Sequence, residues 1–364
     1  MSNKYVFILA GGRGERFWPK SRLDLPKHLL AIAGNSPMIC QTIKRVKGIV
    51  PINNIFVITN IKHKLNIQKY CPDLGPDQII AESIGRDTAA AVAVALAIIK
   101  HKNPNGVFAI LPADHKIHNE KKFKISLQAA FLTAKKTSFL VSIGIQPTIP
   151  ATGYGYIKRG KIVFKINGNS IFKVEKFVEK PNALKAKTYL SSKNYYWNTG
   201  IFIWTVKAIE TAFKKYAPEY FKMINILLQG LALNKSIESL IRKEYLKVDK
   251  SSIDYTLMEK AKEIIMIESI FDWDDVGDWL SIERHYPKDK QSNVIRGEAI
   301  IAEGSKNIIF NDNESDHLIT MIGISNVIVV RTKDATLICS KKHSQEIKNI
   351  VQKIGTIKKY SHLL

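Results

Sequence analysis

The sequence predicts an α/β fold followed by a small β-rich domain, and three observations support this prediction. β-rich and helix-compatible segments alternate through the first half of the chain. The first β-rich segment enters a glycine-rich turn. After Tyr286, short β-rich runs separated by turn residues replace the alternation. Alternation with short connections predicts a parallel sheet covered by helices on both faces.

Strands and helices of the first half are expected in a regular order. The expected strands are Tyr5–Ala10, Ile55–Thr59, Gln78–Ala81, Val107–Leu111 and Phe139–Gly144. The expected helices are Met38–Gly48, Ile61–Tyr70, Thr88–His101 and Lys121–Lys135. Ligands bind beyond the carboxyl ends of strands in such sheets, so the segments that follow strands are the candidate sites.

The second half reads differently. Strands are expected at Lys158–Lys165, Ile171–Glu179 and Trp197–Trp204, with a short helix near Leu184–Leu190 and helical segments up to Met258. The tail is expected to form strands at Ala299–Ala302, Asn307–Phe310, Val327–Val330 and Thr336–Cys339, a turn at Asn311–Asn313 and a closing helix at Ser344–Ile354. We therefore expect one domain at residues 1–286 and a β-rich domain at 287–364, built as a few β-helix coils.

Composition indicates a cytoplasmic protein. The chain has 364 residues and a formal charge of +23, but its lysines are scattered and form no long basic run, so we expect no nucleic-acid partner. Its three cysteines form no CxxC pair, which fits a reducing compartment. The longest apolar helix-like run, Ala89–Ile99, is too short to span a bilayer, and the N-terminal apolar run is too short for a signal peptide, so no membrane partner is expected.

The turn after the first strand is the strongest candidate for phosphate binding. Glycines allow backbone N–H groups to approach an anion, and Gly11, Gly12 and Gly14 stand here. Arg16 and Lys27 follow and can neutralise a polyphosphate. The Gly-Lys-Ser/Thr of a Walker loop is absent, and a phenylalanine replaces the third glycine of a dinucleotide fingerprint. The alternative is an ordinary tight turn.

Two acidic segments are candidates for a divalent cation. Asp114 follows a buried strand, where a carboxylate can hold Mg²⁺, although a capping or turn aspartate is the alternative. The segment Phe271–Trp279 contains four aspartates, Asp272, Asp274, Asp275 and Asp278, in a basic chain. A solvated acidic loop is the alternative, but the flanking tryptophans favour partial burial. Asp114 and Asp275 together predict a bipartite metal site.

Three further segments suit nucleotide or sugar recognition. Residues 82–88 precede an alanine-rich helix, where Glu82 can accept the N1–H and N2–H donors of guanine and Asp87 can cap the helix. Glu179 and Lys180 end a strand before a proline and can meet sugar hydroxyls and a phosphate, although such a pair is usually plain surface. Residues 153–156 and 197–200 combine glycines, aromatics and an amide, which suit polyol recognition or a packed turn.

Taken together, these segments resemble one family. The chain resembles mannose-1-phosphate guanylyltransferases, also called GDP-mannose pyrophosphorylases, through blocks that cover nearly its whole length in the family's order. The blocks are GGRGERFWPKSRLDLPKHLL, AESIGRDTAAAVA, LPADHKI, TGYGYIKRG, VEKFVEKP, WNTGIFIW, SIDYTLMEKA and FDWDDVGDW. The resemblance implies a nucleotide-diphospho-sugar transferase fold, a Rossmann-like mixed sheet covered by helices, with a left-handed β-helix-like tail.

The resemblance also implies an activity and its residues. GMP passes from GTP to α-D-mannose 1-phosphate, and pyrophosphate leaves after Mg²⁺-assisted in-line attack at the α-phosphorus. The implied catalytic residues are Arg16, Lys27, Asp114 and Asp275, of which Asp114 and Asp275 hold Mg²⁺. The implied nucleotide-binding residues are Gly11, Gly12, Gly14, Glu82, Arg86 and Thr88. The implied sugar-phosphate-binding residues are Gly153, Glu179, Lys180 and Asn198. We expect the two metal-binding aspartates to converge beside the turn that contains Gly11, Gly12 and Gly14, hereafter the glycine loop.

Departures from the family's pattern bear on specificity. His28 stands where relatives usually have glutamine, Ser83 replaces a proline and Asp87 an asparagine of the guanine loop. Asp278 and Lys20 replace a common serine and a common leucine. Transfer from UTP, dTTP or ATP and a non-catalytic subunit that binds GDP-mannose are the alternatives. No isomerase activity is expected, and the β-rich domain is a plausible contact surface for a homo-oligomer.

Overall fold

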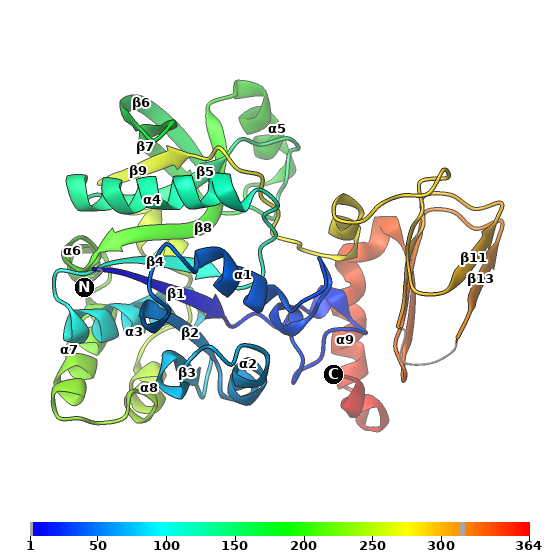
Figure 1. Ribbon diagram of the computed structural model, residues 1–364, viewed down its shortest axis with the longest axis horizontal. Helices are drawn as coiled ribbons and strands as arrows, with labels where there is room; N and C mark the ends of the chain where they lie inside the picture. The colour runs from blue at the N-terminus through cyan, green and yellow to red at the C-terminus, as the bar shows by residue number, and fades with distance from the viewer. Residues whose placement is uncertain (1–2, 313–316) are drawn as a thin grey trace. The chain divides into compact units, whose positions relative to one another are not determined.

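The computed structural model describes residues 3–312 and 317–364 (Figure 1). The chain forms two compact units, and each contains segments that lie far apart in the sequence. The first unit comprises Met1–Gly11, Thr42–Ala113 and Ile117–Trp273. The second comprises Gly12–Gln41, Asp114–Lys116 and Asp274–Leu364. Gly12, Gly14 and the segment around Asp275 therefore belong to the same unit.

A nine-stranded mixed sheet organises the first unit, in the order β3-β2-β1-β4-β8-β5-β9-β7-β6. The strands are β1 (Lys4–Ala10), β2 (Ile55–Asn60), β3 (Ile79–Glu82), β4 (Val107–Pro112), β5 (Leu140–Ile145), β6 (Tyr156–Ile166), β7 (Asn169–Val178), β8 (Tyr195–Thr205) and β9 (Ile264–Glu268). β1 pairs in parallel with β2 and β4, as the alternation predicts. β8, from the second half of the chain, lies antiparallel to both β4 and β5, so the mixed sheet that the resemblance implies is confirmed.

Helices of the first unit pack on this sheet. They are α2 (Lys64–Tyr70), α3 (Asp87–Lys102), α4 (Glu120–Thr137), α5 (Ala183–Ser192), α6 (Val206–Tyr216), α7 (Pro218–Ala232) and α8 (Ile237–Glu244), while the residues of α1 (Met38–Val46) are divided between the two units. Residues 89–99 of α3 are buried, because this apolar helix packs against β1, α6 and α7. Within the described ranges, no helix is long and apolar enough to cross a membrane.

Short parallel strands build the second unit. β10 (Val294–Arg296), β12 (Ile308–Asn311) and β14 (Val327–Arg331) pair in parallel, and β15 (Thr336–Ser340) closes this sheet antiparallel to β14. β11 (Ala299–Ala302) and β13 (Ile319–Ile322) form a second parallel pair. Two rows of short parallel strands are the arrangement expected for β-helix coils. The turn expected at 311–313 includes residue 313, which lies outside the described residues.

A separate apolar core holds the second unit together. Trp279 is fully buried and contacts the rings of Phe17 and Phe310, with centroids 5.2 Å and 4.9 Å away. The glycine loop thus shares one core with the β-rich tail. α9 (Ile347–Gly355), preceded by a short 3-10 turn, is the expected closing helix and contacts the 3-10 segment Glu15–Phe17.

Candidate active site

The glycine loop is shaped by the close approach of Gly14 and Lys27. Gly14 has φ +68°, and a Cβ at this position would lie 2.3 Å from the Cβ of Lys27. Only glycine allows this approach and this backbone conformation without strain. The segment after the turn forms only a three-residue 3-10 helix, Glu15–Phe17, because prolines at 19 and 26 prevent a longer one.

Lys27 joins three distant segments of the second unit. Its Nζ donates to Oδ2 of Asp114 at 2.7 Å and to the backbone carbonyl of Asp275 at 2.6 Å. The Lys27 side chain is only 8% exposed, whereas that of Asp114 is 31% exposed. Lys27 is therefore a fixed cation, and Asp114 and Asp275 meet beside the glycine loop.

Electrostatics keep Asp114 ionised. Desolvation raises the pKa of its carboxyl, but the charge of Lys27 outweighs this effect, together with the charge of His115, the Lys27 hydrogen bond and the charge of His28. The pKa of Asp114 falls to about 2. The carboxylate is a permanent oxygen donor at neutral pH, which suits a hard divalent cation.

Other predicted residues of the loop are open to solvent. Gly12 is exposed, and a side chain at that position would meet no heavy atom within 4 Å. Gly11, in the first unit, has the same properties. Packing therefore does not require glycine at either position. Arg16 is exposed, and among the described residues its side chain has no ion-pair or hydrogen-bond partner.

Two aspartates of the acidic segment, Asp272 and Asp274, have structural partners. Asp272 accepts from the backbone N–H groups of His118 and Asn119, at 2.8 Å and 2.7 Å. Asp274 pairs with Arg284 and His285. Within residues 3–312 and 317–364, no group of three or more His, Cys, Asp or Glu side chains could hold a metal ion.

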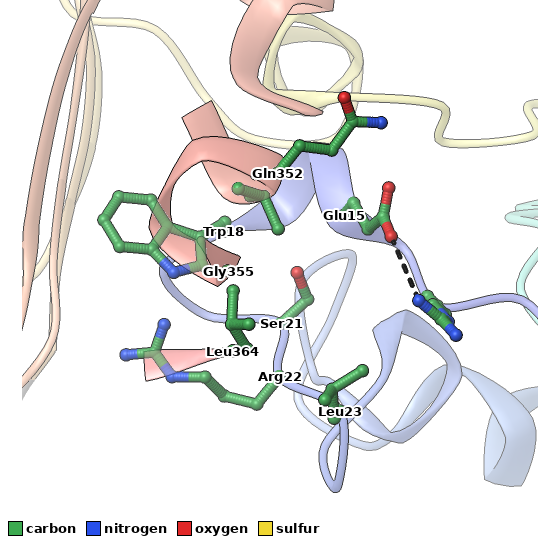
Figure 2. A pocket seen from close by; sticks show the side chains of 10 residues that line it. Glu15, Trp18, Ser21, Arg22, Leu23, Gln352, Gly355 and Leu364 are labelled. Atoms are coloured by element: carbon green, nitrogen blue, oxygen red, sulfur yellow. Dashed lines mark ion pairs between the residues drawn. The ribbon is translucent and has the colours of Figure 1, made fainter. Parts of the chain in front are cut away.

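The segment that follows the glycine loop is hydrogen-bonded to the C-terminal segment. The Leu363 carbonyl accepts from Trp18 Nε1 at 2.8 Å and from Arg22 at 2.9 Å. A pocket of about 160 Å³ lies between residues 13–23 and the segment around α9 (Figure 2). Arg13 lines this pocket and pairs with Glu15 at 3.7 Å. Arg13 is thus engaged locally.

A second cluster of polar groups lies in the first unit. Lys180 Nζ contacts Glu179 Oε1 at 2.5 Å, and Asn198 Nδ2 donates to Asp254 Oδ1 at 2.8 Å. A Cβ at residue 155 would lie 2.4 Å from Glu179 Oε2 and 3.3 Å from the Asn198 Cβ, so Gly155 places these side chains together. Three of the four residues predicted for the sugar phosphate therefore converge.

Burial gives this cluster an unusual carboxyl. Desolvation, followed by the charge of Glu179, raises the pKa of Asp254 to about 7. The Glu179 side chain is 9% exposed, and Lys180, at 58%, is the accessible cation. Gly153, the fourth predicted residue, is exposed beside Tyr154, whose ring contacts Trp197 and Trp273 at 5.1 Å and 5.2 Å.

The predicted base-recognition loop is a third feature, also in the first unit. Glu82 is 6% exposed and accepts from the Tyr245 hydroxyl at 2.6 Å. Desolvation raises the pKa of Glu82 to about 7 against the effect of this hydrogen bond. Arg86 donates to the Tyr245 carbonyl, and Thr88 Oγ1 accepts from a backbone N–H group, so both side chains hold the loop in shape.

Several departures from the family's pattern have local structural reasons. Lys20 pairs with Asp312. Asp278 caps the 3-10 helix Trp279–Arg284 and also accepts from Ser344 at 3.1 Å. Asp87 begins α3 with φ +65°, one residue earlier than predicted, and accepts from the Thr88 N–H.

The sequence analysis assigned no role to Asp254 and Tyr245, and it included Gly155 only as part of residues 153–156. Gly155 stands in the quoted block TGYGYIKRG and Asp254 in SIDYTLMEKA, so their blocks were visible but their contacts were not. The sequence feature that could have indicated Asp254 was its carboxylate, which directly follows an apolar residue in one of the blocks shared with the family. Nothing local in the sequence marks Tyr245, because its partner Glu82 lies 163 residues away.

Comparisons with models of protein families show the general class of enzyme to which the chain belongs. Residues 5–292 match the family model described as nucleotidyl transferase. Residues 297–354 match the model described as MannoseP isomerase/GMP-like beta-helix domain. The chain is therefore a nucleotidyl transferase with a β-helix domain.

Individual relatives show the particular family within the nucleotidyl transferases. A mannose-1-phosphate guanylyltransferase of Klebsiella pneumoniae is 33% identical over 95% of this chain and 72% of that protein. One of Salmonella montevideo is 34% identical over 98% of this chain and 75% of that protein. A crystal structure from Thermus thermophilus, described as a mannose-1-phosphate geranyltransferase, has a TM-score of 0.86 at 29% identity and covers 97% of this chain and 99% of that one. The chain belongs to the mannose-1-phosphate guanylyltransferase family.

Proposed function

We propose that this protein transfers GMP from GTP to α-D-mannose 1-phosphate, with release of pyrophosphate and formation of GDP-mannose. One contact in the structure supports specific residues for this reaction. The Lys27 ammonium is held between the Asp114 carboxylate and the Asp275 carbonyl, next to the glycine loop. A fixed cation beside an ionised carboxylate and exposed backbone N–H groups suits a nucleoside triphosphate with its divalent cation.

The chemistry of the nucleophile limits what the protein must supply. A phosphate monoester has a second pKa of about 6, so the phosphate of mannose 1-phosphate is already largely ionised at neutral pH. Its oxygen attacks the α-phosphorus in line, the bond to the pyrophosphate oxygen breaks, and no general base or covalent enzyme intermediate is needed. Positioning of the two anions and neutralisation of the leaving group supply most of the catalysis.

Each group of residues has a role in this scheme. Gly11, Gly12 and Gly14 approach the triphosphate through their backbone. Arg16, which is exposed, and Lys27 neutralise the α-phosphate and the departing pyrophosphate. Glu82, Arg86 and Thr88 recognise the base and ribose.

The residues present fit a magnesium ion. Asp114 and Asp275 offer hard oxygen donors, and the pKa of about 2 keeps Asp114 ionised. Mg²⁺ is usually held by one or two carboxylates plus substrate phosphates and water, so two carboxylates suffice. When bound, the ion would neutralise charge that develops on the phosphate oxygens.

The cluster around Asn198 suits the sugar phosphate. Glu179 and the Asn198 side chain can bind sugar hydroxyls, and the accessible Lys180 ammonium can bind the phosphate. Gly153 is exposed at the edge of the same segment as Gly155. Asp254 fixes the Asn198 amide and so joins this proposed subsite.

A panel of substrates tests the proposal. Purified protein with Mg²⁺ is given GTP, UTP, dTTP or ATP with mannose 1-phosphate, and then GTP with other sugar 1-phosphates. Pyrophosphate release and GDP-mannose formation are measured. Fast turnover only with GTP and mannose 1-phosphate is expected. Preference for another nucleotide would contradict the assignment, and binding of GDP-mannose without turnover would identify a non-catalytic subunit.

The setting of the reaction follows from the same chemistry. We place it in the cytoplasm, where nucleotide triphosphates and sugar phosphates occur and where the free cysteines Cys40, Cys71 and Cys339 stay reduced. The β-rich tail is our candidate surface for homo-oligomer formation. Size-exclusion chromatography with light scattering on the full chain and on a variant with charged substitutions at the exposed Ile322 and Ile338 tests this surface.

A further inference from the structure

One short segment of the first unit holds the base-recognition loop in place. Tyr245 is fully buried at the start of the 3-10 helix Tyr245–Lys247. Its hydroxyl donates to Glu82 Oε1 at 2.6 Å, and its carbonyl accepts from Arg86 Nε at 2.8 Å. Tyr245 therefore contacts the loop through both its side chain and its backbone.

The same segment contacts the loop again at the start of α3. The backbone N–H of Ile253 donates to Thr88 Oγ1 at 2.8 Å, and the backbone N–H of Ala89 donates to the Ser251 carbonyl at 3.1 Å. Residues 82–89 are thus fixed at four points by residues 245–253. A loop held in this way keeps one conformation before its ligand arrives, which lowers the entropic cost of binding.

The contact with Glu82 is the one with chemical consequences. Among the described residues, Tyr245 is the only hydrogen-bond partner of the Glu82 carboxylate. A buried carboxylate that receives one O–H donor has a defined rotamer, and its remaining lone pairs point in fixed directions. Desolvation raises the pKa of Glu82, the hydrogen bond from Tyr245 lowers it, and the charge of Asp87 raises it.

We propose that Tyr245 is a positioning residue for base discrimination, because its hydroxyl fixes Glu82 in the orientation that accepts the N1–H and N2–H donors of guanine. This inference rests on the proposed function, in which Glu82 recognises the base. A site built to accept a hydrogen bond discriminates against an analogue that lacks the donor, provided that the acceptor is held in place. Hypoxanthine lacks the 2-amino donor of guanine, so ITP is the informative analogue.

The Tyr245→Phe variant tests the inference through the ratio of kcat/KM for GTP to kcat/KM for ITP. We expect this ratio to fall about tenfold, the equivalent of one hydrogen bond to a charged group. KM for mannose 1-phosphate should stay unchanged. A merely structural role would lower kcat/KM for both nucleotides equally and leave the ratio intact, which would overturn the inference.

A matched control separates positioning from loss of stability. Tyr196 is also buried, and its hydroxyl donates to Glu268 Oε1 at 2.7 Å. Tyr196→Phe removes a comparable hydrogen bond to a carboxylate that involves neither the loop nor residues 245–253, so it should lower Tm without changing the GTP/ITP ratio. If Tyr196→Phe lowers the ratio as much as Tyr245→Phe does, Tyr245 has no special role.

Two further variants complete the design. Tyr245→Phe combined with Glu82→Gln should be no less selective than Glu82→Gln alone, because Tyr245 acts through Glu82; additive effects would contradict this. Arg86→Gln acts at the Tyr245 carbonyl, leaves the buried ring in place and should also lower the ratio. If a variant, Tyr245→Phe or Arg86→Gln, is folded and its GTP/ITP ratio of kcat/KM is unchanged, the inference is overturned. Failure of the wild-type protein to use GTP would instead refute the proposed function.

Discussion

The Asp254→Asn substitution should stabilise the protein at alkaline pH while leaving its binding of the sugar phosphate nearly unchanged. Asp254 is half-buried beside Glu179, and its Oδ1 accepts from Asn198 Nδ2 at 2.8 Å. Asparagine retains an oxygen for this hydrogen bond and removes the buried charge. The effect on stability therefore reports the charge alone.

The magnitude follows from the pKa of Asp254, which rises from 3.8 to about 7 on folding. The folded state binds the proton more tightly, so the stabilising contribution is fully present below the unfolded pKa and is lost as pH rises through about 7. A shift of roughly three units corresponds to about 4 kcal/mol as an upper value. The stability of Asp254→Asn relative to wild type should rise between pH 4 and pH 8 by about 2 to 4 kcal/mol.

Urea denaturation of both proteins across this pH range measures the difference. Asp272→Asn is the matched control, because the pKa of Asp272 is lowered by the backbone N–H groups of His118 and Asn119 despite some desolvation. The relative stability of that variant should change with pH in the opposite direction. A pH-independent difference for Asp254→Asn would refute the reasoning. In steady-state assays, KM for mannose 1-phosphate should stay close to that of the wild type, because asparagine still accepts from Asn198.

Two other substitutions test the loop and the sugar cluster. Gly14→Ala should lower stability by at least about 1 kcal/mol from the positive φ alone. It should also lower turnover, because the new Cβ would displace Lys27. Gly12→Ala, at an open position, is the control for stability, and equal urea midpoints for the two variants would contradict the packing argument. Lys180→Ala should raise KM for mannose 1-phosphate about tenfold and leave KM for GTP unchanged, whereas a change confined to the KM for GTP would reverse the role assigned to Lys180.

Alternation of segments was enough to predict most of the sheet. The strands at 55–60, 107–112 and 299–302 were predicted to within one residue, because β-branched runs between turn residues are distinctive. β9 at Ile264–Glu268 was missed, because a short apolar run next to a helical segment cannot be assigned by periodicity. The insertion of the antiparallel β8 between β4 and β5 was also invisible, since strand order depends on tertiary packing.

The site shows the same division. Residue types and family blocks led to Lys27, Asp114 and Asp275, and the structure brings these three together. The sequence could not reveal that Lys27 reaches the backbone carbonyl of Asp275. It could not reveal either that Asp272 accepts from two backbone N–H groups or that Asp274 is an ion-pair partner. Such contacts depend on which atoms face each other after folding.

Turnover of the Asp114→Asn variant tests the central claim most directly. The carboxylate is paired with Lys27 and holds the cation in our scheme, so its loss should lower kcat for GDP-mannose formation under saturating GTP, mannose 1-phosphate and Mg²⁺ by at least about 100-fold. An unchanged circular dichroism spectrum would show that the fold is intact. Near-normal turnover by this folded variant would contradict the assignment of Asp114 and Lys27 as the centre of the reaction.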